Sequence, residues 1–201
     1  MKRPLIFAFA FVSAFASAAN GQTPAACPAE DRAYCEEAER LAAHPAVQRA
    51  FAHAEAKDDE ALRNLIMLTE IPAPPFGEEE RGRVFARMLR EAGADSVWTD
   101  EVGNVIALRK GTVGGRVVAI GGHLDTVFPE ETDVTVRMSG DTLYAPGVGD
   151  DTRGLIVVHY ALEAMNVADL RTEADLLFIG TVGEEGLGDL RGVKHLFREG
   201  G

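Results

Sequence analysis

The feature that most constrains this chain is a pair of short apolar runs, each leading into residues that can carry chemistry. Residues 117–120 lead through two glycines to His123 and Asp125, and residues 176–179 lead to Glu184-Glu185. A short apolar run bounded by turn residues is typical of a buried strand. Open α/β sheets keep their reactive groups at the ends of such strands. The sequence therefore predicts that these side chains emerge at strand ends, where a site can form.

The spacing of His123 and Asp125 indicates a shared task. Residues i and i+2 of an extended segment point the same way, and a carboxylate commonly orients a metal-binding imidazole. Two acidic pairs, Asp150-Asp151 and Glu184-Glu185, strengthen this interpretation, because a mixed set of His and carboxylates suits zinc or a similar divalent ion. The carboxylates are too many for one ion, and one Asp can bridge two metals that activate a shared water. Glycines on either side of the second pair allow the backbone to turn, so that one Glu ligates and the other acts as a general base.

A blander interpretation of each feature stays open at this point. Acidic pairs on loops are usually only solvated, and a single His at a strand end is more often structural than a ligand. The occurrence of three such features together favours a metal site, because each follows an apolar run or a glycine-rich turn. The remaining histidines are assigned to helices and to no site: His44, His53, His159 and His195.

The charge of the chain excludes some classes of partner. Its 201 residues include 32 acidic and 20 basic residues, which gives a formal net charge of −12. Such a chain lacks the basic footprint that DNA or RNA binding needs, and it would repel anionic membrane surfaces. We therefore expect no nucleic-acid partner and no membrane partner beyond a cleaved signal.

The first residues predict export. Lys2 and Arg3 precede an apolar stretch at residues 5–15, and Ala16-Ser17-Ala18 follows as a small-residue cleavage site. This is the pattern of a secretory signal peptide over residues 1–18, with an uncleaved membrane anchor as the alternative. We therefore expect a periplasmic or secreted protein.

The two cysteines of the chain, Cys27 and Cys35, both lie just after this segment. An exported protein meets an oxidising compartment, so we expect a disulfide between them. Two free thiols are one alternative. A lipid on Cys27 is another, and it is disfavoured because Pro24-Ala25-Ala26 is not a convincing lipid-attachment sequence.

The periodicity of apolar residues predicts an α/β fold preceded by N-terminal helices. Helices are expected at residues 31–43, 46–56, from Asp58 or Asp59 as N-cap, 78–92, 154–165 and 190–198, and strands at 96–99, 104–108, 116–120, 134–138, 142–144 and 176–179. Strands that alternate with helices favour a three-layer α/β/α sandwich. The hairpin at residues 134–144 favours a mixed sheet, which we expect to be mostly parallel.

Several stretches of the chain together resemble the co-catalytic dinuclear zinc peptidases that include carboxypeptidase G, peptidase T and the aminoacylases. They span most of the chain after residue 58: Ile71-Pro72-Ala73-Pro74-Pro75-Phe76, Asp100-Glu101-Val102-Gly103-Asn104-Val105, Gly122-His123-Leu124-Asp125-Thr126-Val127, Ala145-Pro146-Gly147-Val148-Gly149-Asp150-Asp151 and Gly183-Glu184-Glu185-Gly186. The resemblance implies hydrolysis of peptide or N-acyl amino-acid amide bonds. It also implies two Zn²⁺ ions in the complete site, with Co²⁺ or Mn²⁺ as alternatives.

The resemblance also implies a role for each candidate residue. His123 is expected to bind one zinc, with the Asp125 carboxylate behind it, and Asp150 to bridge the two ions. Glu185 is expected to bind the other zinc, and Glu184 to act as the general base. Relatives often have a cis peptide bond after the bridging Asp, so we expect one between Asp150 and Asp151.

The chain departs from the family pattern in two places. Thr152-Arg153 stand where many relatives have a Lys, which puts only the subfamily in doubt. Relatives are also longer, and they supply a further acidic ligand, a second His and a smaller domain for dimerisation and substrate capture. We therefore expect residues 19–57 to be a helical segment and residues 58–201 to be the N-terminal portion of an incomplete catalytic domain. This portion alone should bind metal weakly and turn over little, and the full-length enzyme is expected to be a homodimer.

Two rival functions remain at this point. The related zinc aminopeptidases share the His-x-Asp and paired-acid order, although residues 71–75 and 123–127 favour the first family. The other rival is a non-catalytic protein that keeps only the fold. The intact Glu184 and the intact acidic pairs argue against it.

Overall fold

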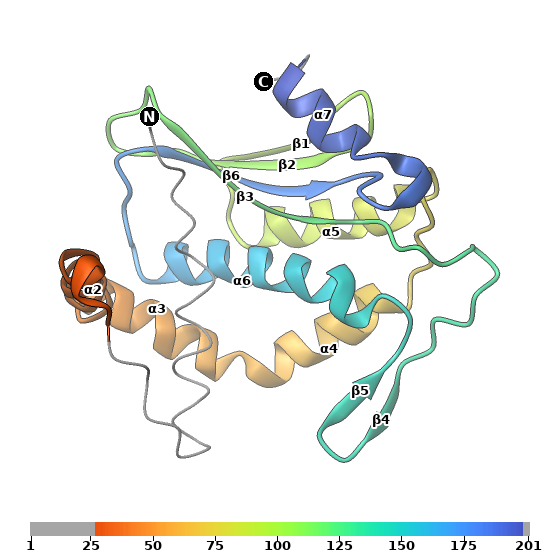
Figure 1. Ribbon diagram of the computed structural model, residues 1–201, viewed down its shortest axis with the longest axis horizontal. Coiled ribbons are helices and arrows are strands. Elements are labelled where there is room, and N and C mark those ends of the chain that lie inside the picture. The colour runs from red at the N-terminus through yellow and green to blue at the C-terminus, as the bar shows by residue number, and fades with distance from the viewer. Residues whose placement is uncertain (1–26, 199–201) are drawn as a thin grey trace. The chain divides into compact units, whose positions relative to one another are not determined.

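Figure 1 shows the computed structural model, which describes residues 27–198. The chain divides into two compact units, Met1–Ala43 and His44–Gly201. In the smaller unit the structure describes α2 (Arg32–Ala42), and a disulfide joins Cys27 to Cys35 with an S–S distance of 2.03 Å. The predicted disulfide is therefore confirmed. The predicted signal peptide lies outside the described residues.

The larger unit contains the other helices and all the strands that the structure describes. The helices are α3 (Pro45–Ala56), α4 (Asp58–Thr69), α5 (Glu79–Glu91), α6 (Arg153–Val167) and α7 (Arg191–Arg198). The strands are β1 (Ser96–Thr99), β2 (Val105–Arg109), β3 (Val117–His123), β4 (Arg137–Ser139), β5 (Thr142–Tyr144) and β6 (Asp175–Thr181). Every expected element is present, with its ends shifted by a few residues at most. Across residues 27–198, no helix combines the length and apolarity needed to cross a membrane.

The helices of this unit cover both faces of its main sheet. In Figure 1, α5 and α6 lie on one face, and α7 lies on the other. This arrangement confirms the predicted α/β/α layers. Although α3 precedes residue 58, it packs on α6, where Arg49 donates a hydrogen bond to the main-chain oxygen of Ala168 at 3.0 Å.

One predicted helix start is wrong by a residue. Asp58 or Asp59 was expected to cap α4, but Asp58 is already helical and Lys57 occupies the N-cap without a side-chain hydrogen bond. Asp58, Asp59 and Glu60 instead occupy the first turn. Their negative charge is favourable there because it faces the positive end of the helix dipole.

The main sheet has the strand order β1-β2-β6-β3. Its first two pairings are antiparallel, and β3 pairs with β6 in parallel, with His123 opposite Thr181. The sheet is mixed, as predicted, but among the described residues it is not mostly parallel. The reason is that β1 and β2 are joined by a tight turn at residues 100–104, which forces them to be antiparallel, whereas β3 reaches β6 through the crossover helix α6.

The position of β3 also corrects an expectation about burial. The apolar run at residues 117–120 was expected to be a buried strand, yet Val117 is 60% exposed and Val118 is 48% exposed. Within the described residues β3 pairs only with β6 and forms the edge of the sheet. Its side chains therefore lack a neighbouring strand on one side.

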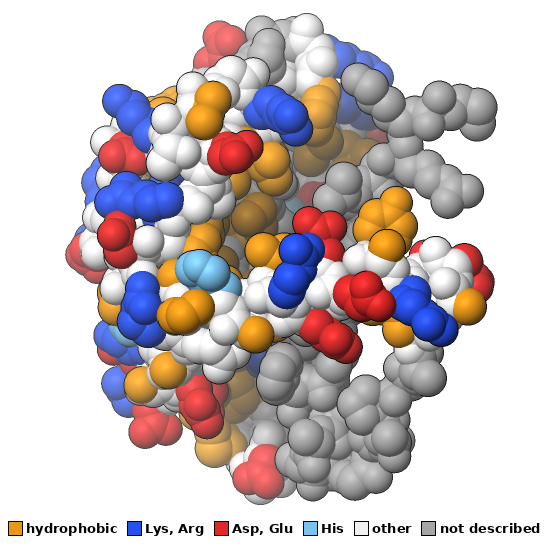
Figure 2. Space-filling view, turned by 90° about the vertical axis from the view of Figure 1, so that its left-hand side faces the viewer, with side chains coloured by type: hydrophobic (Ala, Val, Ile, Leu, Met, Phe, Trp, Pro, Cys, Tyr) orange, Lys and Arg blue, Asp and Glu red, His pale blue; other side chains and the backbone are white. Residues whose placement is uncertain are grey.

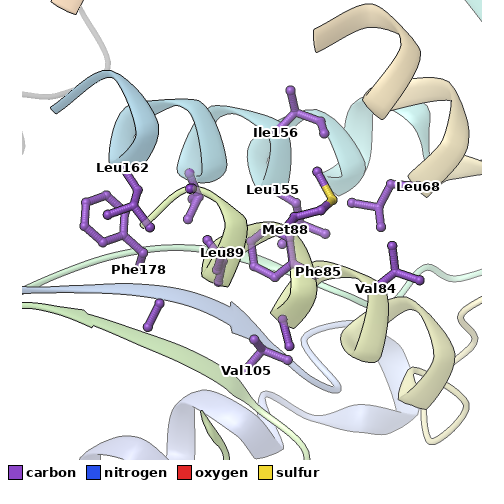
Figure 3. Packing of buried hydrophobic residues seen from close by; sticks show 14 of the residues in the cluster. Leu68, Val84, Phe85, Met88, Leu89, Val105, Leu155, Ile156, Leu162 and Phe178 are labelled. Atoms are coloured by element: carbon purple, nitrogen blue, oxygen red, sulfur yellow. The ribbon is translucent and has the colours of Figure 1, made fainter. Parts of the chain in front are cut away.

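The core lies between the sheet and the helices α5 and α6 (Figure 3). Phe85 and Leu89 of α5 and Leu155 of α6 are fully buried, as is Phe178 of β6. Each fully buried side chain of this size contributes about 1.5–3 kcal/mol. This packing fixes the start of α6 and the end of β6 relative to one another, and the candidate site forms at these two ends.

Candidate metal centre

Three candidate ligands converge where the parallel strands β3 and β6 end. His123 is the last residue of β3, Glu185 follows β6, and Asp150 lies in an irregular turn, Val148–Thr152, before α6. One ligand atom from each of these three residues lies within 4.8 Å of the other two. Among residues 27–198 this is the one cluster of three or more such groups. The parallel register explains the convergence, because it places both strand ends at the same edge of the sheet.

The imidazole of His123 lies between two acceptors. Its Nε2 is 2.9 Å from Asp150 Oδ1, and its Nδ1 is 3.0 Å from the main-chain oxygen of Asp125. The side chain is only 11% exposed. Burial acts to lower the pKa of His123, but the carboxylates of Asp125 and Asp150 outweigh it and raise that pKa to about 9. Surroundings that favour a positive charge on the His123 imidazole also suit a metal cation in place of the imidazole proton.

The Asp125 carboxylate lies on the Nδ1 side of the His123 ring. Its Oδ1 is 3.6 Å from Nδ1, an ion-pair distance, and the main-chain oxygen of Asp125 is the hydrogen-bond partner of Nδ1. The fully buried carboxylate accepts the N–H groups of Glu184 at 2.9 Å and Glu185 at 2.8 Å. Burial acts to raise the pKa of Asp125, but the neighbouring His123 and these N–H groups hold it below its usual range. Asp125 therefore fixes the turn that follows β6 as well as the ring of His123.

The peptide bond between Asp150 and Asp151 is cis, as expected. The two side chains point to different environments. The Asp150 carboxylate is 80% exposed and faces His123, whereas Asp151 accepts the N–H groups of His123 and Gly154, both at 3.0 Å. Burial raises the pKa of Asp151, although these N–H groups oppose the shift. Asp151 thus joins the end of β3 to the start of α6.

The second acidic pair lies on a turn that a glycine makes possible. Gly183 has a positive φ of 60°, as expected of the glycine before the pair. Burial and the nearby Asp150 carboxylate raise the pKa of Glu185. Glu184 is half-buried beside it and is not one of the three clustered groups. The structure thus brings together the three predicted ligands and places the predicted base next to one of them, while the roles themselves stay predictions.

Sequence reasoning gave no role to several residues that hold these loops in place. They are Glu78, Arg81, Asn104, Asp151 and Arg191. Arg81 is fully buried and donates to the main-chain oxygens of Leu124, at 2.9 Å, and Ile71, at 3.1 Å. Burial lowers its pKa to about 10, against the attraction of Asp125. Asn104 and Asp151 lie in stretches that resemble the family, which was the visible signal for them. Glu78, Arg81 and Arg191 carry no such signal, because charged residues near a helix start are common in this sequence.

The chemistry of the cluster fits a zinc centre. One imidazole and two carboxylates are ligands that zinc accepts, and an Asp with two oxygens is able to serve two ions. On the face drawn in Figure 2, basic side chains lie among acidic ones and do not gather into a stripe.

Comparison with known proteins gives a consistent result. Residues 119–201 match the model of Peptidase family M20/M25/M40. A hydrolase of Pyrococcus abyssi named for LysW-lysine and LysW-ornithine is 34% identical over 128 residues, which are 64% of this chain and 34% of the relative. A Thermococcus kodakarensis protein of the same name is 31% identical over 138 residues, 69% of this chain and 36% of the relative. The chain therefore spans about a third of the length of the curated relatives it matches.

Solved structures share the fold. Aminopeptidase PepT from Bacillus cereus superposes with a TM-score of 0.55 at 21% identity, covering 64% of this chain and 37% of that one. Human carnosine dipeptidase 1 superposes with a TM-score of 0.58 at 18% identity, covering 69% and 35%. At such identities the likeness concerns the fold alone. The matched family model confirms the resemblance found in the sequence: residues 119–201 of this chain carry part of a domain of the M20/M25/M40 peptidase family.

Proposed function

We propose that this chain carries part of the catalytic centre of a metal-dependent hydrolase that cleaves peptide or N-acyl amino-acid amide bonds. The observation that carries the proposal is the convergence of His123, Asp150 and Glu185, with Glu184 beside them. The matched family model supports the reaction class. The names of the relatives, which are hydrolases, an aminopeptidase and a dipeptidase, agree with it.

In this proposal the cluster would hold two zinc ions, with Co²⁺ or Mn²⁺ as alternatives. His123 and Asp150 would be ligands of one ion, and Glu185 and Asp150 would be ligands of the other. Bound metals of this kind polarise the substrate carbonyl and lower the pKa of a water.

The other residues act on protons and orientation. The Glu184 carboxylate accepts a proton from the attacking water and later delivers it to the leaving amine. Asp125 holds the main-chain N–H groups of Glu184 and Glu185, which keeps the base and the ligand at fixed positions. The main-chain oxygen of Asp125 keeps Nδ1 of His123 as the donor, so Nε2 is the nitrogen that faces the ligand position.

Zinc content and hydrolysis of a dipeptide and an N-acyl amino acid test the proposal together. The wild-type chain should take up zinc, and His123→Ala should lose most of it. Glu184→Gln should keep the zinc but lose at least about a hundredfold in rate, because general-base catalysis contributes this much. Glu130→Gln, at an exposed position outside the cluster, is the control and should change neither. A wild-type chain that takes up no zinc, or a fully active Glu184→Gln, would contradict the proposal.

The aminopeptidase alternative differs only in where the substrate is held, and the same assays with free and blocked N-termini separate the two. A fold without chemistry is the other alternative, and zinc uptake that depends on His123 argues against it. We also propose export, supported by the signal pattern at residues 1–18 and the Cys27–Cys35 disulfide, which suits an oxidising compartment. A homodimer of the full-length enzyme is part of the proposal as well.

A further inference from the structure

The turn that follows β6 is held in an unusual way. Four consecutive main-chain N–H groups, those of residues 182–185, each donate a hydrogen bond to a side chain from another part of the chain. Val182 donates to Asn104 at 3.0 Å, Gly183 to Glu78 at 3.0 Å, Glu184 to Asp125 at 2.9 Å and Glu185 to Asp125 at 2.8 Å. The turn that carries the proposed base and one proposed ligand is thus fixed by three separate segments.

Glu78, like Asn104, is an acceptor that the proposed chemistry does not use. It lies directly before α5, and its carboxylate is buried. Besides the hydrogen bond from the Gly183 N–H group, it accepts one hydrogen bond from each terminal nitrogen of Arg191, both at 2.9 Å. Such a two-pronged contact between a guanidinium and a carboxylate is among the strongest hydrogen-bonded pairs in proteins, and it fixes the orientation of both groups.

Arg191, the first residue of α7, confines Gly183 from a second direction. A Cβ atom on Gly183 would overlap the Arg191 guanidinium and would lie 2.9 Å from Arg191 Cγ. The guanidinium also lies over the ring of Phe76, 4.6 Å from its centroid, in a cation–π contact. Gly183 is therefore held by its N–H group on Glu78 while the Arg191 side chain covers its Cα.

We infer that Glu78 and Arg191 are positioning residues for the metal centre, acting through Gly183 on the direction of Glu184 and Glu185. This inference rests on the proposed function. A buried ion pair is by itself weak evidence for stability, because apolar side chains of similar size often serve equally well. The hydrogen bond from the Gly183 N–H group to Glu78 indicates a positioning role, since a pair kept only for packing has no need to accept the N–H group next to the proposed base.

The inference explains why one acceptor is not enough. Asp125 accepts the N–H groups of Glu184 and Glu185. The N–H group of Gly183, the residue whose backbone angles set the direction of the turn, is accepted by Glu78. Loss of the pair should therefore loosen the turn at its start, even though Asp125 remains.

The test compares zinc affinity, measured by competition with a chromophoric chelator, and amide hydrogen exchange at residues 183–185. Glu78→Gln keeps the shape but presents an amide group to Arg191, and Arg191→Lys keeps the charge but loses the two-pronged contact. Each should weaken zinc binding about tenfold or more, as loss of a group that orients a ligand does, and should speed exchange at Gly183.

Arg109→Lys is the matched control. Arg109 is also buried, and it donates to Asn166 Oδ1 at 2.7 Å near the far end of β6, where it pairs with Leu176. This variant should lose stability but keep zinc affinity within about twofold. Its exchange at residues 183–185 should not change beyond the effect of the lower global stability.

The outcomes separate the two claims. If the wild-type chain binds zinc and a folded Glu78→Gln or Arg191→Lys binds it equally well, the positioning role is wrong and the proposed function stands. An equal loss of affinity in Arg109→Lys would also overturn the positioning role, because the effect would follow from general destabilisation. If the wild-type chain binds no zinc, the proposed function fails, and the positioning role fails with it.

Discussion

The two acidic pairs look alike in the sequence but are built in opposite ways. In Asp150-Asp151, one carboxylate serves the fold: Asp151 accepts the N–H groups of His123 and Gly154, while Asp150 is 80% exposed and faces His123. In Glu184-Glu185, it is the main-chain N–H groups that are held, by the buried Asp125. Both Glu side chains remain half-buried beside the cluster.

The difference shows two ways in which hydrogen bonds can fix a loop so that its carboxylates stay close to one site. In the first pair, Asp151 anchors the loop and Asp150 faces His123. The second pair takes its anchor from elsewhere in the chain, so both carboxylates are free for chemistry. This agrees with the proposed roles, in which the first pair supplies one functional group and the second supplies two.

Replacing Asp125 should break the second pair most severely. Asp125→Ala leaves the N–H groups of Glu184 and Glu185 without acceptors, and it removes the charge next to the fully buried Arg81. We expect the free energy of unfolding to fall by about 3–5 kcal/mol, as when one partner of a buried charge pair is removed. Zinc binding should be lost as well, because the turn that carries Glu185 is no longer fixed. Urea denaturation and zinc competition measure the two effects.

Asp125→Asn provides a graded comparison for that result. The amide keeps one acceptor oxygen, so its loss of stability should be smaller than that of Asp125→Ala. Equal stability of wild type and Asp125→Ala would show that the turn is held without this carboxylate.

The first pair should separate stability from metal binding. Asp151→Ala removes the acceptor for two N–H groups and should lower the free energy of unfolding by about 1–3 kcal/mol. Asp150→Ala removes an exposed side chain and should stay within about 0.5 kcal/mol of wild type, while its zinc affinity falls sharply. Denaturation curves and zinc titrations of the two variants should therefore rank them in opposite orders. If Asp150→Ala proves the less stable of the two variants, Asp151 is not the anchor of this pair.

Much of this arrangement could be predicted from the sequence, because local signals carry it. The apolar runs predicted the strands, and the disulfide followed from two cysteines eight positions apart. The three clustered groups were predicted because each follows a strand or a glycine turn. The expected cis bond came from the family resemblance, which could be recognised only from several motifs together.

What the sequence could not show are contacts between residues far apart in the chain. Glu78 reaches Gly183 and Arg191 across more than a hundred positions, and no local pattern distinguishes it from Glu79 or Glu80. The hydrogen bonds from the N–H groups of Glu184 and Glu185 to the Asp125 carboxylate were missed for the same reason, since i and i+2 spacing says nothing about distant partners. The exposure of residues 117–120 depends on which strands lie beside β3, which an apolar run does not reveal.

The smallest expected effect concerns the space around the two aspartates of the first pair. A Cβ atom on Gly122 would lie 2.6 Å from Asp151 Oδ2 and 3.2 Å from the main chain of α6, whereas one on Gly149 would meet nothing within 4 Å. Gly122→Ala should therefore cost about 1–2 kcal/mol, because it pushes Asp151 away from the N–H groups that it accepts. Gly149→Ala should stay within about 0.5 kcal/mol. Thermal unfolding of both variants measures the difference, and equal melting temperatures would mean that Asp151 moves aside at no cost and is not an anchor. If Gly122→Ala melts at a lower temperature than Gly149→Ala, Asp151 is the residue that restrains this loop. Asp150 is then held only by its place in the turn and by His123.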